Sequence, residues 1–102
     1  MNVITLENKK SQSVFVTLDG QSCLIRLIQR DSFMYMDLTV GGNPIMQGVP
    51  CLYANKIVRY KYLGFRGDLF FLDNEGKNDP VWTELTDRFP LYYITEAELE
   101  LV

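Results

Sequence analysis

Residues 14–40 read VFVTLDGQSCLIRLIQRDSFMYMDLTV, and this stretch decides the fold. Apolar and polar side chains alternate through most of it, which is the period-two pattern of a strand with one buried face. Asp19-Gly20 and Asp31-Ser32 interrupt the alternation, and both dipeptides favour tight turns. The stretch therefore predicts three consecutive strands joined by two short hairpins, over 14–18, 21–30 and 33–40.

The flanking sequence shows the same pattern in shorter pieces. Further strands are expected over 3–6, 45–49, 57–63, 69–72 and 91–95. Asp79-Pro80 resembles an N-cap followed by proline in the first helical position, and the apolar residues Trp82, Leu85 and Phe89 follow at helical spacing. This pattern predicts one short helix near residues 79–88. The last residues, 96–102, are expected to form a further strand or a loose tail.

The connections between these strands are too short for the crossovers that parallel strands need, so the pairing is expected to be antiparallel. No linker, repeat or low-complexity tract divides the chain. We therefore predict an all-β fold, a small antiparallel sandwich or barrel with one short helix, in a single domain spanning 1–102.

Composition argues against an enzyme. The 102 residues include no histidine, which removes the commonest general base at neutral pH and the commonest zinc ligand. No nucleophile elbow, phosphate-binding glycine loop or dinucleotide fingerprint is present. Cys23 and Cys51 fit no metal spacing and are expected to be small buried hydrophobes. We expect no catalytic residue, no metal and no cofactor.

The acidic residues of the second half could in principle hold a metal ion, so their order matters. It does not match a calcium-binding loop, in which oxygen ligands alternate and a glutamate closes the loop. These residues are instead expected to cap turns and to keep a sheet edge soluble. They are Asp68, Asp73, Glu75 and Asp79.

Nothing in the sequence resembles a signal peptide or a segment of about 20 apolar residues that could cross a bilayer. We expect a soluble protein made in the cytoplasm, without membrane insertion.

Charge is unevenly distributed along the chain. Residues 1–66 carry eight basic and four acidic side chains, a net charge of +4, whereas residues 67–102 carry two and nine, a net charge of −7. The sum is the overall −3. Such a chain can pair its own halves, or it can pair with copies or neighbours in an assembly.

Residues 53–66 interleave basic and aromatic side chains, the mixture with which small β-barrels contact phosphates and stack bases. The residues are Tyr53, Lys56, Arg59, Tyr60, Lys61, Tyr62, Phe65 and Arg66. A single-strand nucleic-acid-binding barrel is therefore one alternative. The acidic balance of the whole chain argues against it, and alternating tyrosine and lysine is also typical of a half-exposed strand.

The second half also carries a recognisable series of motifs. These are Gly67-Asp68-Leu69-Phe70-Phe71, Asp73, Gly76, Asp79-Pro80, Trp82, Leu85, Arg88 and Leu91-Tyr92-Tyr93. Their order and spacing resemble those of the small baseplate plug proteins of contractile-tailed bacteriophages, the cyanophage baseplate plug family. In the first half Val16–Gln21, Tyr35–Leu38 and Gly48-Val49-Pro50 resemble the family's first hairpin, next strand and following turn. At Phe33-Met34-Tyr35 the chain departs from the tryptophan-tyrosine start that is common in the family.

The resemblance implies a virion structural protein of the tail baseplate. It implies a position near the hub and spike, a role in closing the tail tube until injection, and no catalysis. The expected partners are the hub, spike and tube proteins, and copies of the chain itself. As contact residues we predict Tyr60, Tyr62, Phe65, Arg66, Glu96, Glu98 and Glu100. An oligomeric β adaptor module without a tail role, encoded by a host or a prophage, is the other alternative.

Overall fold

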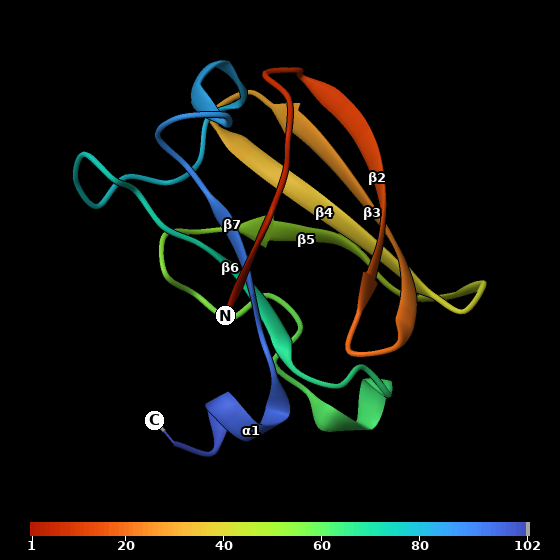
Figure 1. The fold of residues 1–102 in the computed structure, drawn as a ribbon. Coiled ribbons are helices and arrows are strands. Elements are labelled where there is room, and N and C mark those ends of the chain that lie inside the picture. The colour runs from red at the N-terminus through yellow and green to blue at the C-terminus, as the bar shows by residue number, and fades with distance from the viewer. Residues whose placement is uncertain (102) are drawn as a thin grey trace.

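The computed structural model describes residues 1–101, which form two antiparallel β-sheets with the hydrophobic core between them (Figure 1). The four-stranded sheet contains, in spatial order, β2 (Ser11–Leu18), β3 (Gln21–Arg30), β4 (Phe33–Val40) and β5 (Asn43–Cys51). The three-stranded sheet contains β1 (Asn2–Ile4), β7 (Leu91–Ile94) and β6 (Asp68–Phe71) in that order. The helical segments are the 3₁₀ turns η1 (Lys61–Leu63) and η2 (Trp82–Glu84) and the single-turn helix α1 (Glu96–Leu99).

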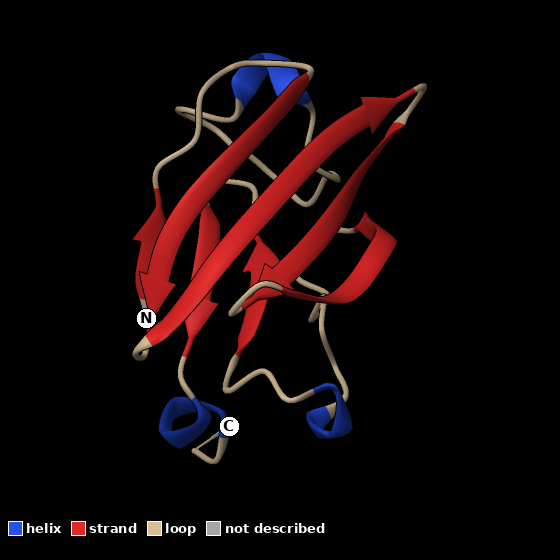
Figure 2. Ribbon diagram, turned by 90° about the vertical axis from the view of Figure 1, so that its right-hand side faces the viewer, coloured by secondary structure: helices blue, strands red, loops and turns tan. Residues whose placement is uncertain are grey.

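The all-β prediction is confirmed, with a two-sheet, sandwich-like arrangement and no closed barrel. Figure 2 shows the four-stranded sheet in front of the shorter strands of the other sheet. The first hairpin turns at Asp19 and Gly20, whose φ angles are 52° and 73°. Two successive positive φ angles match the twist of the flanking strands, which is why Asp-Gly serves here. The turn sets the register of β2 on β3 by pairing Leu18 with Gln21.

The fifth strand is longer than its apolar pattern predicts. β5 includes Pro44 and Pro50, although proline lacks the backbone donor of a central strand. It is accommodated because β5 is the last strand of its sheet and its pairing with β4 shifts register twice. The expected strand over 45–49 is thus the middle of an irregular edge strand.

Three segments differ from the local pattern. Residues 57–63 form an irregular segment and the turn η1, so the strand predicted there is wrong. Within 79–88 the helical part is the single turn η2, because the Asp79 carboxylate accepts the Tyr53 N–H (2.8 Å) and Val81, which precedes the turn, provides no side-chain cap. The tail begins with α1, so the strand alternative for 96–102 is wrong; Val102 lies outside the described residues.

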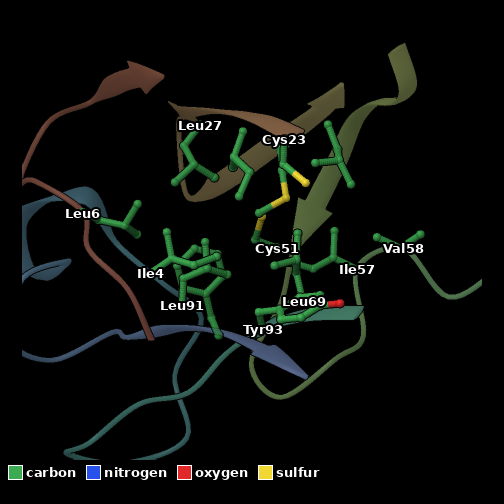
Figure 3. Close-up of a cluster of buried hydrophobic side chains, with 14 of the residues drawn as sticks. Ile4, Leu6, Cys23, Leu27, Cys51, Ile57, Val58, Leu69, Leu91 and Tyr93 are labelled. Atoms are coloured by element: carbon green, nitrogen blue, oxygen red, sulfur yellow. The ribbon is translucent and has the colours of Figure 1, made fainter. Parts of the chain in front are cut away.

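The core draws on both sheets (Figure 3). Ile25, Leu27 and Leu38 of the large sheet and Leu69 and Leu91 of the small sheet have almost no exposed surface. The close packing of such side chains contributes most of the favourable free energy of folding.

Both cysteines belong to this cluster, as predicted. Cys23 and Cys51 are free thiols and buried. Burial raises the pKa of the Cys51 thiol to about 12, because the thiolate is poorly solvated there. Both therefore behave as small core side chains. No helix within residues 1–101 is long and apolar enough to cross a lipid bilayer.

Gly67 provides a test of how closely β6 and β7 approach one another. Its φ is +90°, and a Cβ placed on it would overlap the Ile94 carbonyl oxygen and lie 2.7 Å from Tyr93 Oη. Gly42 has a similar φ of +84° with open space around it. We expect Gly67→Ala to destabilise the fold by about 1–3 kcal/mol more than Gly42→Ala, measured by thermal denaturation followed by circular dichroism. Equal losses would contradict the close approach.

Candidate protein-interaction site

A buried carboxylate fixes the conformation of the segment between β5 and β6. Asp68 is 4% exposed, and its Oδ1 accepts the backbone N–H groups of Ile57 (3.1 Å), Val58 (2.8 Å) and Leu69 (2.7 Å). Its Oδ2 accepts the N–H of Arg59 (2.9 Å). A carboxylate that accepts several backbone donors forms strong, charge-assisted hydrogen bonds. Asp68 therefore binds the N–H groups of Val58 and Arg59 and shares that of Ile57 with the Leu69 carbonyl of β6.

This arrangement explains why residues 57–63 leave the strand conformation. After Val58, whose side chain is buried, Arg59 takes a φ of +69°, which turns the chain away from the sheet. The turn presents Tyr60 and Tyr62 to solvent, with exposed fractions of 54% and 81%. Their rings stack with centroids 5.4 Å apart. The two tyrosines thus form an exposed aromatic pair on a segment anchored in the core.

Phe65 was predicted to be a contact residue but is buried. Its side chain is 3% exposed and packs edge-on against Tyr93, with ring centroids 5.8 Å apart. It is a core residue because the chain turns inward again before β6, and its ring is not on the surface.

Arg66 is held by its backbone and keeps an exposed side chain. The Gln21 amide accepts the Arg66 N–H (2.9 Å) and donates to the Arg66 carbonyl (3.1 Å), and Tyr93 Oη donates to the same carbonyl (2.6 Å). The guanidinium pairs with Asp19 at 3.3 Å, and both side chains are half exposed. Arg66 therefore links this segment to the first hairpin.

The acidic tail is ordered by a capping box. The Thr95 hydroxyl accepts the Glu98 N–H (3.2 Å), and the Glu98 carboxylate accepts the Thr95 N–H (3.0 Å). The N-terminal ammonium of Met1 also donates to Glu98, and these bonds, with the ammonium as the main cause, hold the pKa of Glu98 at about 2. Glu98 is thus engaged in bonds within the chain, whereas Glu96 on α1 and Glu100 just after it are exposed.

The fold brings part of each predicted group of contact residues to one cavity: Tyr60 and Phe65 from the first, and Glu96 and Glu100 from the second. A cavity of about 220 Å³ lies between the middle segment and α1, and its walls include Arg59 and Tyr60 on one side and Glu96 and Glu100 on the other. Phe65 and the backbone around Gly67 complete the wall. Tyr62 and Arg66 lie in the same chain segment but do not line this cavity. We call the exposed residues Tyr60, Tyr62, Arg66, Glu96 and Glu100 the tyrosine–glutamate surface.

Of the other acidic residues of the second half, Asp73 and Asp79 bind groups of the fold through their carboxylates, whereas Glu75 is exposed. Asp73 is buried; its carboxylate binds Arg88 at 2.8 and 3.1 Å and accepts the N–H groups of Glu75 and Asn78. The Arg88 guanidinium holds the pKa of Asp73 well below its usual range. Within residues 1–101 no group of three or more Cys, Asp or Glu side chains is arranged to hold a metal ion. These carboxylates organise loops, as their positions in turns predicted.

The segment 53–66 does not present the continuous aromatic and basic face expected of a base-stacking platform. Phe65 is buried, Arg59 Nε donates to the Lys56 carbonyl (2.8 Å), and Arg66 pairs with Asp19. The strand that would have aligned these side chains is absent.

Two buried polar residues have roles at the site that were not predicted from the sequence. Gln21 binds Arg66, 45 residues away in the chain, and Asp68, which was expected only to cap a turn, binds the backbone of a segment nine to eleven residues before it. A polar residue at a core-facing position of an alternating strand is a usable signal, and Gln21 occupies one in β3. The order Thr95-Glu96-Ala97-Glu98 is likewise a capping-box signature.

The charge imbalance between the halves persists in the fold. Among residues 1–101, the side-chain ion pairs join partners from the same half of the chain: Lys9–Glu7 and Arg66–Asp19 in the first, Arg88–Asp73 and Arg88–Glu84 in the second. Within residues 1–101 the halves are joined by one ion pair, between the N-terminal ammonium of Met1 and Glu98, and otherwise do not neutralise one another by direct pairing.

Comparison with known proteins identifies one family. The family described as "Cyanophage baseplate Pam3 plug gp18" matches residues 1–96 of the 102-residue chain. No curated protein gives a significant match.

Replacing Asp68 tests how the middle segment is held. Asp68→Asn keeps the shape but turns two N–H donors toward a backbone N–H, so we expect a loss of about 1–3 kcal/mol in the free energy of unfolding. Hydrogen exchange at the Val58 and Arg59 amides should accelerate as well. Asp87→Asn is the control, because Asp87 is exposed. Unchanged protection of both amides in the Asp68 variant would contradict the anchoring role.

The ion pair of Asp73 and Arg88 is expected to make the free energy of unfolding depend on pH. The pKa of Asp73 is lower in the folded state, so its contribution is fully present above the unfolded value of about 3.9 and is lost as pH falls below it. We expect Asp73→Asn to lower the melting temperature at pH 7, and the difference from the wild type to shrink between about pH 4 and pH 2. A pH-independent difference would exclude this linkage.

Proposed function

Because the chain belongs to the cyanophage baseplate plug family, and is thus a structural protein of a phage tail baseplate, we propose that it works as a non-enzymatic plug held by contacts with other baseplate proteins. The match over residues 1–96 carries the assignment to the baseplate. The proposed contacts rest on the surface features described above.

The hub, spike and tube proteins are the proposed partners, and closure of the tail tube until injection is the proposed task. The protein is made in the host bacterial cytoplasm and assembles into the virion in this proposal. A plug is retained by packed area and complementary charge, and it needs no titratable catalytic group. The opposite net charges of residues 1–66 and 67–102 support such a role, since within residues 1–101 the Met1 ammonium and Glu98 form the one ion pair between the halves.

The tyrosine–glutamate surface is the proposed contact. Tyrosine and arginine are enriched among the residues that dominate binding energy, because they combine a large apolar area with a polar end. The stacked pair of Tyr60 and Tyr62 is exposed, yet it follows a segment whose backbone is bound to the buried Asp68. A pre-ordered aromatic pair loses little conformational entropy on binding.

The absence of catalysis is also a proposal. It is supported by the engagement of Asp68, Asp73 and Asp79 with backbone N–H groups and by the burial of both thiols. Groups held this way serve the fold and do not face a substrate.

Binding to tails that lack the protein tests the proposed contact. Tail particles assembled by a phage or prophage deleted for this gene are incubated with the purified chain. We expect the double variant Tyr60→Ser/Tyr62→Ser to bind at least about 30-fold more weakly than the wild type, the loss expected for a central aromatic contact.

Phe33→Ser is the matched control, because Phe33 is an aromatic residue of β4 that is 42% exposed and lies outside this surface. It should bind like the wild type. The proposed contact is wrong if the double variant, folded normally by circular dichroism, binds the tails as tightly as the control.

A further inference from the structure

We propose that the free edge of β2 pairs with β2 of a second copy of this chain, antiparallel and centred on Val14, so that the two four-stranded sheets join into one. This inference does not depend on the baseplate role. It rests on the edges of the sheets, on the direction of the unpaired backbone groups, and on the charges at the two ends of β2.

β2 is the least protected sheet edge within residues 1–101. β1 has only three residues, and the outer side of β6 is covered by backbone hydrogen bonds from Ala54 and Ile57. β5 is interrupted by two prolines and two register shifts. β2, in contrast, has eight residues in unbroken register on β3 and contains no charge, proline or glycine. Soluble proteins usually protect such edges with those devices, so an unprotected edge indicates a strand that is covered in use.

The hydrogen-bonding phase of β2 shows which groups are available. The Gln29 N–H donates to the Lys10 carbonyl (2.8 Å), and the two-residue turn joins Leu18 to Gln21. Hydrogen-bonded pairs alternate along an antiparallel ladder, so the even-numbered residues of β2 bind β3. The odd-numbered residues direct their N–H and C=O groups to the open edge. They are Ser11, Ser13, Phe15 and Thr17.

A two-fold axis beside Val14 satisfies all four of these residues. It places Ser13 opposite Phe15 of the second copy and Ser11 opposite Thr17, so every outward N–H and C=O finds a partner. In this register, the side chains that point toward the core in one copy lie opposite side chains that point toward the core in the other. Val14 then faces its own copy and Val16 faces Gln12, which covers apolar surface that is only partly buried at present.

The outer, solvent-facing side of the joined sheet would also bury apolar surface. Phe15 is 79% exposed, the most exposed of the aromatic residues in the sheets. In this register the two Phe15 rings are diagonal neighbours, a spacing within reach of aromatic side chains.

Charge favours a second copy in the antiparallel direction. Continued beyond the strand, the register sets Lys9, which precedes β2, opposite Asp19, which follows it, at both ends of the junction. Lys9 is 62% and Asp19 50% exposed, although each already has a local partner in Glu7 or Arg66. Parallel pairing would instead bring like charges together. The strand is thus complementary to itself in one direction only.

Sedimentation over a concentration series, with the wild-type chain, is the first measurement. We expect a monomer–dimer equilibrium. Ser13→Pro removes an outward N–H and no bond to β3, and the two-fold axis doubles the loss, so the dimer should weaken about tenfold. Ser13→Thr keeps the N–H and should associate like the wild type.

Engineered cysteines test the register. Val14 and its copy form a pair without hydrogen bonds, with Cα atoms about 4.5 Å apart, which a disulfide can bridge. Val16 and its copy are offset by four residues, roughly 14 Å. Under oxidation Val14→Cys should yield a covalent dimer and Val16→Cys should not; the native cysteines are buried and do not interfere.

Three outcomes would overturn the proposal: a wild-type chain that stays monomeric throughout the series, association that survives Ser13→Pro unchanged, or equal cross-linking of both cysteine variants. The first would leave the edge for a strand of another protein, and the second would place self-association on another surface.

Discussion

The buried carboxylate of Asp68 fixes the backbone segment that leads into the proposed tyrosine contacts. It accepts four backbone N–H groups, three of them from consecutive residues of the segment before η1. A buried carboxylate is costly unless it is fully hydrogen-bonded, and here its partners are the donors that an irregular segment leaves without a ladder. The hydrogen bonds between them satisfy both the buried carboxylate and the backbone N–H groups. The result is a segment whose first three N–H groups are bound to a core carboxylate, and it places two tyrosines in solvent where a strand would have placed them along a sheet.

Side-chain hydrogen bonds to the backbone hold other segments of the molecule in the same way. Gln21 joins Arg66 to the first hairpin, Asp73 gathers the loop between β6 and η2, and Thr95 and Glu98 close the tail. Polar side chains thus fix the irregular segments of the second half, while the first half relies on long strands. Two exposed features with different physics result: the tyrosine–glutamate surface and the uncharged edge of β2.

Much of this fold could be predicted from sequence because hydrophobic alternation and Asp-Gly turns act locally. The strands predicted over 14–18, 21–30 and 33–40 are all present, although β2 begins earlier than predicted, at Ser11. The middle segment could not be predicted, because its alternation is that of a strand and the competing acceptor, Asp68, lies about ten residues farther on. For the same reason Phe65 was assigned to the surface with Tyr60 and Tyr62, although the chain reverses between them and buries it. The meeting of Tyr60 with Glu96 and Glu100 at one cavity depends on tertiary folding, and the sequence suggests each group only separately.

We propose that this chain works in its tail baseplate through contacts made by its exposed aromatic and acidic side chains. Electron cryo-microscopy of intact virions or tails, at a resolution that shows side chains, tests it most directly. We expect density for this fold on the tail axis, with Tyr60 and Tyr62 buried against a neighbouring baseplate protein. A baseplate that lacks this density, or one in which both tyrosines and the exposed glutamates of α1 face solvent, would contradict the claim.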